Sequence, residues 1–199
     1  MNKNVLITGV TGFLGRNLAA KLIEENYNVV GIAHSEKRIL ESWYRFAGFP
    51  IHCLDIAHDK NQLDYIVKKN KIDLIIHCAA MKHVGLCEKN PYRAVEVNVL
   101  GSKNVVDVAY DNNVENVVGV STDKSINPVC VYGCSKMLME KMFIEKGYPI
   151  CRGVNFLFSD GSVLDIWKKQ KESGVPINVN SSNTVRYFTT IGQFINLIL

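Results

Sequence analysis

The residues best suited to carry out chemistry lie in one short stretch, Ser121–Lys136. It contains Tyr132 and Lys136, whose i, i+4 spacing would place both side chains on one face of a helix. A lysine ammonium beside a phenol favours the phenolate and lowers a pKa that starts near ~10. We therefore expect Tyr132 to act as a general base near neutral pH.

The Tyr-x-x-x-Lys spacing is not specific by itself. The chain has eight tyrosines, and Tyr65 and Lys69 repeat the spacing. Either pair in isolation is most simply interpreted as an exposed helix face. The surrounding elements must therefore decide which pair meets a substrate.

A glycine-rich loop follows the first predicted strand, Asn4–Thr8, and leads into an amphipathic helix pattern that runs to Glu25. A dinucleotide-binding fingerprint requires a strand, a glycine-rich turn and a helix in this order. The glycines of this turn have the spacing G-x-x-G-x-x-G. Such glycines permit a tight turn and bring backbone N–H groups close to a pyrophosphate. The predicted cofactor contacts of this loop are Thr8, Gly9, Thr11, Gly12, Phe13, Leu14 and Gly15.

The second predicted strand, Asn28–Ala33, ends without the acidic residue that many NAD-specific folds use to hold the adenosine ribose. A hydroxyl and two cations follow it, which suits a 2′-phosphate and favours NADP as the cofactor. Glu36 keeps NAD as the alternative, and the two cations could instead open a solvated helix. The predicted contacts here are His34, Ser35, Lys37 and Arg38.

Two further strands are predicted to deliver residues to the same edge of the sheet. Pro50–Leu54 is followed by Asp55 and Ile56, and the Asp55 carboxylate would either bind an adenine amino group or cap the helix Asn61–Asn70. Lys71–His77 is followed by small residues that let the backbone pass close to a cofactor. These predicted cofactor contacts are Cys78, Ala79 and Ala80, and the next loop offers Lys82 and His83 as substrate contacts.

Alternating strands and helices predict an α/β fold, a Rossmann-type doubly wound parallel sheet with a small C-terminal appendage. A long helix, Pro91–Asn112, carries Asn98, which would hold a water or a carbonyl near the cofactor or serve as a core amide. A fifth strand, Glu115–Val120, delivers Tyr132 to the edge that bears the glycine loop. The Tyr65 pair lies far from that edge in this topology, so we discard it.

The bulk properties of the 199 residues exclude several classes of protein. The net charge is +4 and there is no long Lys/Arg run, so the sequence does not indicate a nucleic-acid-binding surface. No apolar run is long enough for a membrane span. The N-terminus does not read as a signal peptide. None of the six cysteines forms a C-x-x-C pair, so we expect reduced thiols in a cytoplasmic protein and no metal site.

Together these motifs resemble those of the extended short-chain dehydrogenase/reductases. More narrowly, HCAAMKHVGLCEKNPYRAVEVNVLGSKNVVDVA and VSTDKSINPVCVYGCSK resemble the inverting UDP-N-acetylglucosamine 4,6-dehydratases of the CapD-like polysaccharide biosynthesis group. The specific element is Asp123-Lys124, which general epimerases of the superfamily usually lack. The resemblance is close over residues 1–146 and looser after them.

The resemblance implies a role for each catalytic residue. Tyr132 would deprotonate the sugar 4-hydroxyl, Lys136 would hold the cofactor ribose and tune Tyr132, and Thr122 would position the hydroxyl. Hydride would pass to the nicotinamide and return to C6, so the cofactor would stay bound. Lys124 would take the C5 proton and Asp123 would protonate the leaving C6 hydroxyl, because elimination needs one group of each kind. Without this context Asp123-Lys124 would be a surface ion pair.

The C-terminal part departs from the family pattern. We expect a cofactor-binding domain over residues 1–155 and a shortened substrate-binding lobe over residues 156–199. Arg152-Gly153-Val154-Asn155 partly matches the family's Arg-Tyr-Gly-Asn, and Val185-Arg186-Tyr187-Phe188 resembles its Thr-Arg-Phe-Trp. Asn155 and Arg186 are therefore predicted substrate contacts, the latter to the diphosphate. Family members continue with an Arg-Pro-Gly-Glu segment that helps to hold the nucleotide.

Three functions are compatible with these residues. The first is an active UDP-sugar 4,6-dehydratase, whose exposed apolar end and long helix favour a homo-oligomer. The second is a short nucleotide-sugar 4-epimerase or ketoreductase that uses only Thr122, Tyr132 and Lys136. The third is a non-catalytic NAD(P)-binding partner protein. The intact catalytic stretch argues against the third function, and the short tail argues for it.

Overall fold

The structure is a computed structural model that describes residues 3–43, 48–179, 181 and 183–199. The chain divides into two compact units, Met1–Arg152 and Gly153–Leu199, and each is described by itself. The first unit contains every predicted site residue except Asn155 and Arg186.

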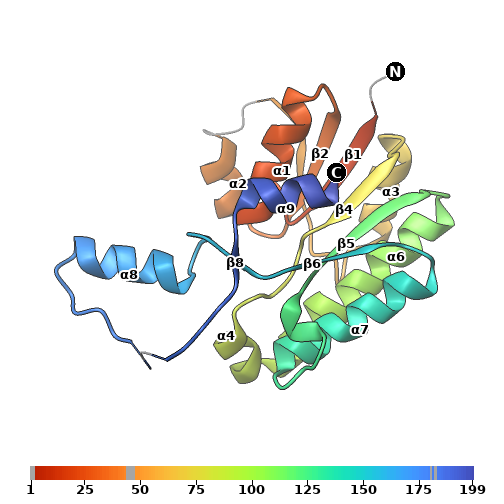
Figure 1. Ribbon diagram of the computed structural model, residues 1–199. Helices are drawn as coiled ribbons and strands as arrows, with labels where there is room; N and C mark the ends of the chain where they lie inside the picture. Colours follow the sequence, from red (N-terminus) through yellow and green to blue (C-terminus); the bar gives the residue numbers. More distant parts are fainter. Residues whose placement is uncertain (1–2, 44–47, 180, 182) are drawn as a thin grey trace. The chain divides into compact units, whose positions relative to one another are not determined.

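The first unit is built on a six-stranded sheet with the order β3-β2-β1-β4-β5-β6 (Figure 1). Strands β1 to β5 pair in parallel, with β1 at the centre between β2 and β4. The strand order reverses between β1 and β4, which is where open α/β sheets bind ligands. The strands are β1 Asn4–Thr8, β2 Asn28–Ala33, β3 Ile51–Cys53, β4 Leu74–His77, β5 Asn116–Thr122 and β6 Ile150–Gly153.

Helices cover this sheet on two faces, as a crossover topology requires. On one face α3, α6 and α7 bury apolar side chains in a core shared with Leu6 of β1 and Ile75 of β4. On the other face α1 buries Leu14, Leu18 and its neighbours. The helices are α1 Phe13–Glu24, α2 Glu36–Trp43, α3 Lys60–Lys69, α4 Val84–Lys89, α5 Pro91–Val95, η1 Glu96–Gly101, α6 Ser102–Asp111, η2 Asp123–Ser125 and α7 Val131–Glu145.

The predicted long helix Pro91–Asn112 has an interruption that we did not predict. Its middle turn, η1, is a π-helix, which separates α5 from α6 and contains Asn98. A π-turn adds one residue to a helical turn and is frequent at functional sites, but no sequence pattern announces it. Asn98 therefore lies on an irregular turn instead of in a uniform helix.

Two predicted strand boundaries also change. The predicted strand Lys71–His77 begins only at Leu74, because Lys71 has a φ of 48° and its N–H still bonds to the Lys68 carbonyl at the end of α3. Strand β5 extends beyond its predicted end to Thr122, so Ser121 and Thr122 are strand residues. The predicted strands Asn4–Thr8, Asn28–Ala33 and Pro50–Leu54 and the predicted helix Asn61–Asn70 lie within one residue of their observed bounds.

The second unit is small. Strand β7 (Asn155–Phe156) pairs in parallel with β8 (Phe188–Thr189). Helix α8 (Val163–Glu172) buries none of its residues. Helix α9 (Ile191–Ile198) begins with a capping box of Thr190 and Gln193, and its Phe194 ring packs against that of Phe156 at 5.0 Å between centroids. No helix in the described parts of the chain is both long and apolar enough to cross a lipid bilayer.

Candidate functional site

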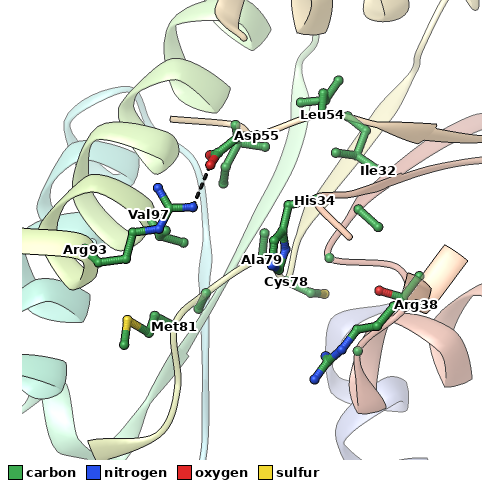
Figure 2. A pocket seen from close by; sticks show the side chains of 16 residues that line it. Ile32, His34, Arg38, Leu54, Asp55, Cys78, Ala79, Met81, Arg93 and Val97 are labelled. Atoms are coloured by element: carbon green, nitrogen blue, oxygen red, sulfur yellow. Dashed lines mark hydrogen bonds and ion pairs between the residues drawn. The ribbon is translucent and has the colours of Figure 1, made fainter. Parts of the chain in front are cut away.

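A pocket of about 290 Å³ lies in the first unit at the carboxyl ends of β1, β2 and β4 (Figure 2). This is the edge at which the sequence places a dinucleotide. The pocket is lined by Gly9, Thr11, Gly12, Ile32, Ala33, His34, Arg38, Leu54, Asp55, Ile56, Cys78, Ala79, Ala80, Met81, Arg93 and Val97.

The glycine loop is shaped by close backbone contacts. Gly9 has a φ of 70°, and a Cβ added there would lie 2.8 Å from the Ala79 backbone. A Cβ at Gly15 would overlap the carbonyl oxygen of Gly9, so Gly15 lets α1 begin directly behind the loop. Gly9 and Gly12 line the pocket and Gly15 does not. The loop thus has the open backbone cradle that a phosphate group requires.

At the end of β2 only part of the predicted set faces the pocket. His34 and Arg38 line it, whereas Ser35 and Lys37 do not. The Lys37 side chain is 86% exposed and lies 4.0 Å from Glu41, one helical turn further along α2. The Ser35 hydroxyl accepts a long hydrogen bond from the Arg38 amide, at 3.4 Å. Arg38 is therefore the cation placed to meet a phosphate in the pocket.

Asp55 has a partner that the sequence did not reveal. Its Oδ2 accepts a hydrogen bond from Arg93 Nη2 at 2.6 Å (Figure 2). Its Oδ1 accepts one from the Ala57 amide at 2.9 Å. Burial acts to raise the pKa of Asp55, but these hydrogen bonds and the guanidinium charge outweigh it and lower the pKa. No local pattern links residues that lie 38 positions apart.

Besides Ser35 and Lys37, five more predicted cofactor contacts from the first half of the chain lie away from the pocket lining. Phe13, Leu14 and Gly15 belong to the start of α1 behind the loop. Thr8 and Asn98 are completely buried, and their polar atoms bond to the protein itself. Neither side chain has exposed surface here, so direct cofactor contact by Thr8 and Asn98 stays a prediction.

The buried Asn98 amide connects two segments of the unit. Its Oδ1 accepts from the Met81 amide at 2.8 Å, and its Nδ2 donates to the Met81 carbonyl at 3.0 Å. Nδ2 also donates to the Ser135 hydroxyl at 2.9 Å, and that hydroxyl donates to the Tyr132 carbonyl at 2.8 Å. Asn98 thus joins the loop after β4 to the first turn of α7.

Tyr132 and Lys136 lie on α7 as predicted, but their electrostatic relation is different. Burial raises the pKa of Tyr132 to about 12, and a side-chain hydrogen bond with Thr122 opposes this only in part. Lys136 is 2% exposed, and burial lowers the pKa of its ammonium to about 8. The Lys136 Nζ lies 2.9 Å from the Met139 sulfur. The expected lowering of the Tyr132 pKa by Lys136 is therefore wrong for the ligand-free protein, because desolvation dominates.

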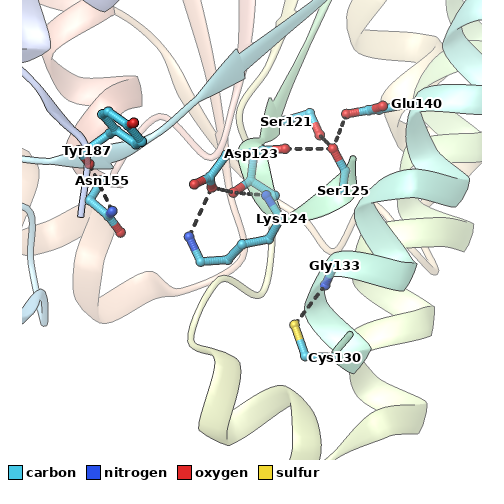
Figure 3. Close-up of polar contacts among 10 residues, drawn as sticks. Ser121, Asp123, Lys124, Ser125, Cys130, Gly133, Glu140, Asn155 and Tyr187 are labelled. Atoms are coloured by element: carbon cyan, nitrogen blue, oxygen red, sulfur yellow. Dashed lines mark hydrogen bonds and ion pairs between the residues drawn. The ribbon is translucent and has the colours of Figure 1, made fainter. Parts of the chain in front are cut away.

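Asp123 and Lys124 form an ion pair on η2, the turn that follows β5 (Figure 3). Lys124 Nζ donates to Asp123 Oδ1 at 3.0 Å, and the Thr122 hydroxyl donates to the same oxygen at 2.9 Å. Burial acts to raise the pKa of Asp123, but the hydrogen bonds from Lys124 and Thr122 lower it overall. The carboxyl is thus ionised beside a cation and a hydroxyl.

A second ion pair, in which only the Glu140 side chain is buried, anchors this turn. The Ser125 hydroxyl contacts the Thr122 carbonyl at 2.6 Å and Glu140 Oε1 at 2.5 Å (Figure 3). Arg152 binds both carboxylate oxygens of Glu140, at 2.9 and 2.6 Å. A Cβ at Gly133 would overlap the Lys124 carbonyl oxygen, so the turn also packs directly on α7. These contacts place Asp123-Lys124 next to the helix that carries Tyr132.

The predicted substrate contacts are less well defined. Lys82 and His83 are exposed in the loop after the pocket. Burial and the charges of Lys82 and Arg38 lower the pKa of His83. In the second unit, the Asn155 amide donates to the Tyr187 carbonyl at 3.0 Å, and Arg186 is exposed with a bond to its neighbour's carbonyl. Among the residues that the structure describes, no His/Cys/Asp/Glu cluster could hold a metal ion.

Residues 5–199 match a family described as polysaccharide biosynthesis protein. A Methanocaldococcus jannaschii protein named as an uncharacterized membrane protein, MJ1061, is 33% identical over 100% of this chain. An inverting UDP-N-acetylglucosamine 4,6-dehydratase of Campylobacter jejuni is 30% identical over 99%, and a UDP-glucose 4-epimerase of Rickettsia canadensis is 30% identical over 100%. The chain spans 62% of the length of each of these relatives.

Solved structures show the same architecture. Pen from Bacillus thuringiensis superposes with a TM-score of 0.91 at 29% identity, over 99% of this chain and 64% of that one. The Bordetella bronchiseptica enzyme WbmH, solved with NAD+, has a TM-score of 0.86 at 22% identity, over 99% of this chain and 71% of that one. The predicted Rossmann-type parallel sheet is therefore confirmed. Because the family match covers nearly the whole chain, this protein belongs to the polysaccharide biosynthesis protein family, as its motifs predicted.

Proposed function

We propose that the chain carries the cofactor site and the catalytic residues of a nucleotide-sugar 4,6-dehydratase that acts on UDP-N-acetylglucosamine. The observation that carries this proposal is the Asp123–Lys124 ion pair on η2, held against the helix of Tyr132. A 4-epimerase or ketoreductase needs only the Thr122–Tyr132–Lys136 set. An adjacent acid and base are what a water elimination adds to it.

The pocket fits a nicotinamide dinucleotide. The Gly9 and Gly12 backbone forms a cradle with no side chain, and the Ala79 backbone closes its other side. His34 and Arg38 lie at the end of β2, where NADP would place its 2′-phosphate, so we propose NADP and keep NAD as the alternative. We assign residues 1–155 as the cofactor-binding domain and 156–199 as part of a substrate-binding lobe. Arg186 of this lobe is a proposed substrate contact, as are Lys82, His83 and Asn155 of the first domain.

The chain's own residues perform the proton transfers in this mechanism. Tyr132 takes the proton from the sugar 4-hydroxyl, which Thr122 orients. A nicotinamide held in this pocket would supply the hydride acceptor for C4 and the hydride donor for C6. Lys136 would hold the cofactor ribose, and the positive charge of an oxidised nicotinamide beside Tyr132 would act to lower the raised pKa of the phenol.

The ion pair provides both groups for the elimination. Asp123 starts as the carboxylate, because burial acts to raise its pKa but the hydrogen bonds from Lys124 and Thr122 lower it overall, and it accepts the hydrogen-bond proton of Lys124. Transfer of that proton across the 3.0 Å hydrogen bond leaves a neutral amine and a carboxylic acid. The amine removes the C5 proton, and Asp123 protonates the departing C6 hydroxyl. For each water released, the Asp123 proton leaves with the C6 oxygen and the C5 proton restores the Lys124 ammonium. The ion pair thus returns to its starting state.

Mass spectrometry of the sugar product tests this function. The protein with UDP-N-acetylglucosamine should yield a product lighter by one water, without net consumption of cofactor. Lys124→Ala and Asp123→Asn should each reduce its formation about 10²- to 10⁴-fold. Tyr132→Phe should do the same, whereas Tyr65→Phe is the matched control with the same i, i+4 lysine and should retain activity. Wild-type protein that binds cofactor but forms no dehydrated product would overturn the proposal.

A 4-epimerase is the second candidate, because relatives with that name match over the whole chain. It predicts a product of unchanged mass and full activity in Asp123→Asn. Cofactor binding without any turnover would instead support a non-catalytic partner protein.

Cofactor titration tests the choice between NADP and NAD. Arg38→Ala should weaken NADP binding about 10- to 100-fold, since a charged hydrogen bond to a phosphate is lost, and should change NAD binding little. Lys37→Ala is the matched control, because Lys37 lies outside the pocket lining. Equal effects of both variants on NADP would contradict the assignment.

We further propose that the protein self-associates and acts in the cytoplasm. Helices α5 and α7 expose Tyr92 and Leu138, and none of the six cysteines forms a disulfide. Light scattering of the purified protein tests the first statement, and a monomer at micromolar concentration would contradict it.

A further inference from the structure

His77 lies at the carboxyl end of β4, completely buried, with its ring stacked on Phe143 at 5.7 Å between centroids. Both ring nitrogens have partners. Nδ1 lies 2.7 Å from the Thr8 hydroxyl, and Nε2 lies 2.9 Å from the Ser102 hydroxyl. The proposed proton transfers do not use this histidine, so its buried polar contacts need an explanation.

The distances determine the direction of each hydrogen bond. The Ser102 hydroxyl lies 2.7 Å from the Asn98 carbonyl oxygen. Two oxygens that close need a hydrogen between them, and only the hydroxyl has one. Ser102 therefore donates to Asn98 and can only accept from His77. Nε2 must then carry the ring proton.

The other half of the arrangement follows from that tautomer. A neutral imidazole with its proton on Nε2 leaves Nδ1 as an acceptor, so the Thr8 hydroxyl donates to it. The Thr8 oxygen remains free to accept, and the Ala79 amide donates to it at 3.3 Å. Four hydrogen bonds thus point the same way: from the Ala79 amide through Thr8, His77 and Ser102 to the Asn98 carbonyl.

The two ends of this chain lie at functionally different places. Ala79 lines the pocket and its backbone lies against Gly9. Asn98 belongs to the π-helical turn and, through Ser135, holds the first turn of α7 where Tyr132 begins. The contacts span up to 71 positions of sequence, so they join three separate segments.

We propose that His77 is a positioning residue that, as the neutral Nε2–H tautomer, holds the cofactor-facing backbone at Ala79 in register with the turn that carries Tyr132. This inference rests on the proposed cofactor site for its functional meaning, but not for its geometry. Burial and the charge of Lys136 lower the pKa of His77 to about 3, which agrees with a neutral ring. An imidazolium would offer two donors, and Thr8 could no longer donate to Nδ1.

Nitrogen-15 NMR of the ligand-free protein tests the geometry directly. At pH 7 the His77 ring, assigned by loss of its signals in His77→Gln, should show a protonated Nε2 and an unprotonated Nδ1. Thr8→Val, which keeps the shape but removes the hydroxyl, should speed hydrogen exchange at the Ala79 amide. Thr8→Ser should restore the slow exchange. A protonated Nδ1, or equal exchange at Ala79 in both variants, would overturn the proposal.

Cofactor titration with the same variants tests the positioning role. Thr8→Val should raise the Kd for NADP about tenfold under conditions where the variant is folded, and Thr8→Ser should stay within about twofold of wild type. Unchanged Kd in Thr8→Val would overturn the positioning role even with the expected tautomer. Wild-type protein that binds neither NADP nor NAD would refute the proposed cofactor site and with it the positioning role. The tautomer and hydrogen bonds of His77 are tested separately by the NMR experiment.

Discussion

Replacing Lys136 by methionine should make the protein more stable while removing its activity. The ammonium is 2% exposed, and burial lowers its pKa from 10.5 to about 8. Each unit of pKa corresponds to about 1.36 kcal/mol, so keeping this proton in the folded state at pH 7 costs about 3 kcal/mol. Methionine fills a similar volume without a charge, so Lys136→Met should recover a large part of that cost.

The same reasoning gives a pH dependence. Between about pH 8 and 10.5 the unfolded chain holds a proton on Lys136 that the folded chain has released. The free energy of unfolding of the wild type therefore rises with pH through this range relative to that of Lys136→Met. The advantage of the variant should be largest below pH 8 and should vanish towards pH 10.5.

Urea denaturation at pH 7 and at pH 9.5 measures this difference. Lys141→Met, an exposed lysine on the same helix, is the matched control and should change stability by less than about 0.5 kcal/mol. The reasoning is refuted if Lys136→Met is less stable than wild type at pH 7. It is also refuted if the difference between the two proteins does not change with pH.

Two further variants probe the turn that carries the ion pair. Arg152→Met leaves Glu140, whose side chain is 3% exposed, without its cation. The variant should lose about 2 kcal/mol of the free energy of unfolding, measured by urea denaturation. This is less than for a fully buried pair, because Arg152 is 46% exposed. Burial acts to raise the pKa of Glu140, but the hydrogen bonds from Arg152 and two serines lower it overall in the wild type. The loss of stability in the variant should therefore shrink below about pH 4.5. A loss that does not change with pH would contradict the assignment. Gly133→Ala should destabilise the fold by about 1–3 kcal/mol and lower Tm, because its methyl group displaces the Lys124 carbonyl. It should also lower the proposed dehydratase activity. Gly85→Ala meets no atom within 4 Å and is the control; equal melting temperatures of the two variants would refute the steric argument.

Local pattern in the sequence was sufficient to predict most of the fold. The Asn4–Thr8 strand, the glycine loop and the α1 pattern specify a βα unit, and the parallel sheet follows from repeating that unit. The Tyr132 and Lys136 spacing predicted a shared helix, which α7 confirms. These features depend on periodicity, turn chemistry and glycine geometry, all of which act over a few residues.

The tertiary structure decided what those side chains experience. Whether Lys136 lowers the pKa of Tyr132 depends on burial, and burial is a property of the packed core, not of a spacing. The partners of Asp55 and of His77 come from segments 38 and 69 positions away, where no short-range pattern acts. Asn98 in the π-turn likewise bonds to Met81 and Ser135, which lie 17 and 37 positions away. Sequence alone thus determined which residues share an edge of the sheet, while packing determined their charge and their hydrogen bonds, because desolvation and partner geometry arise only when distant segments meet.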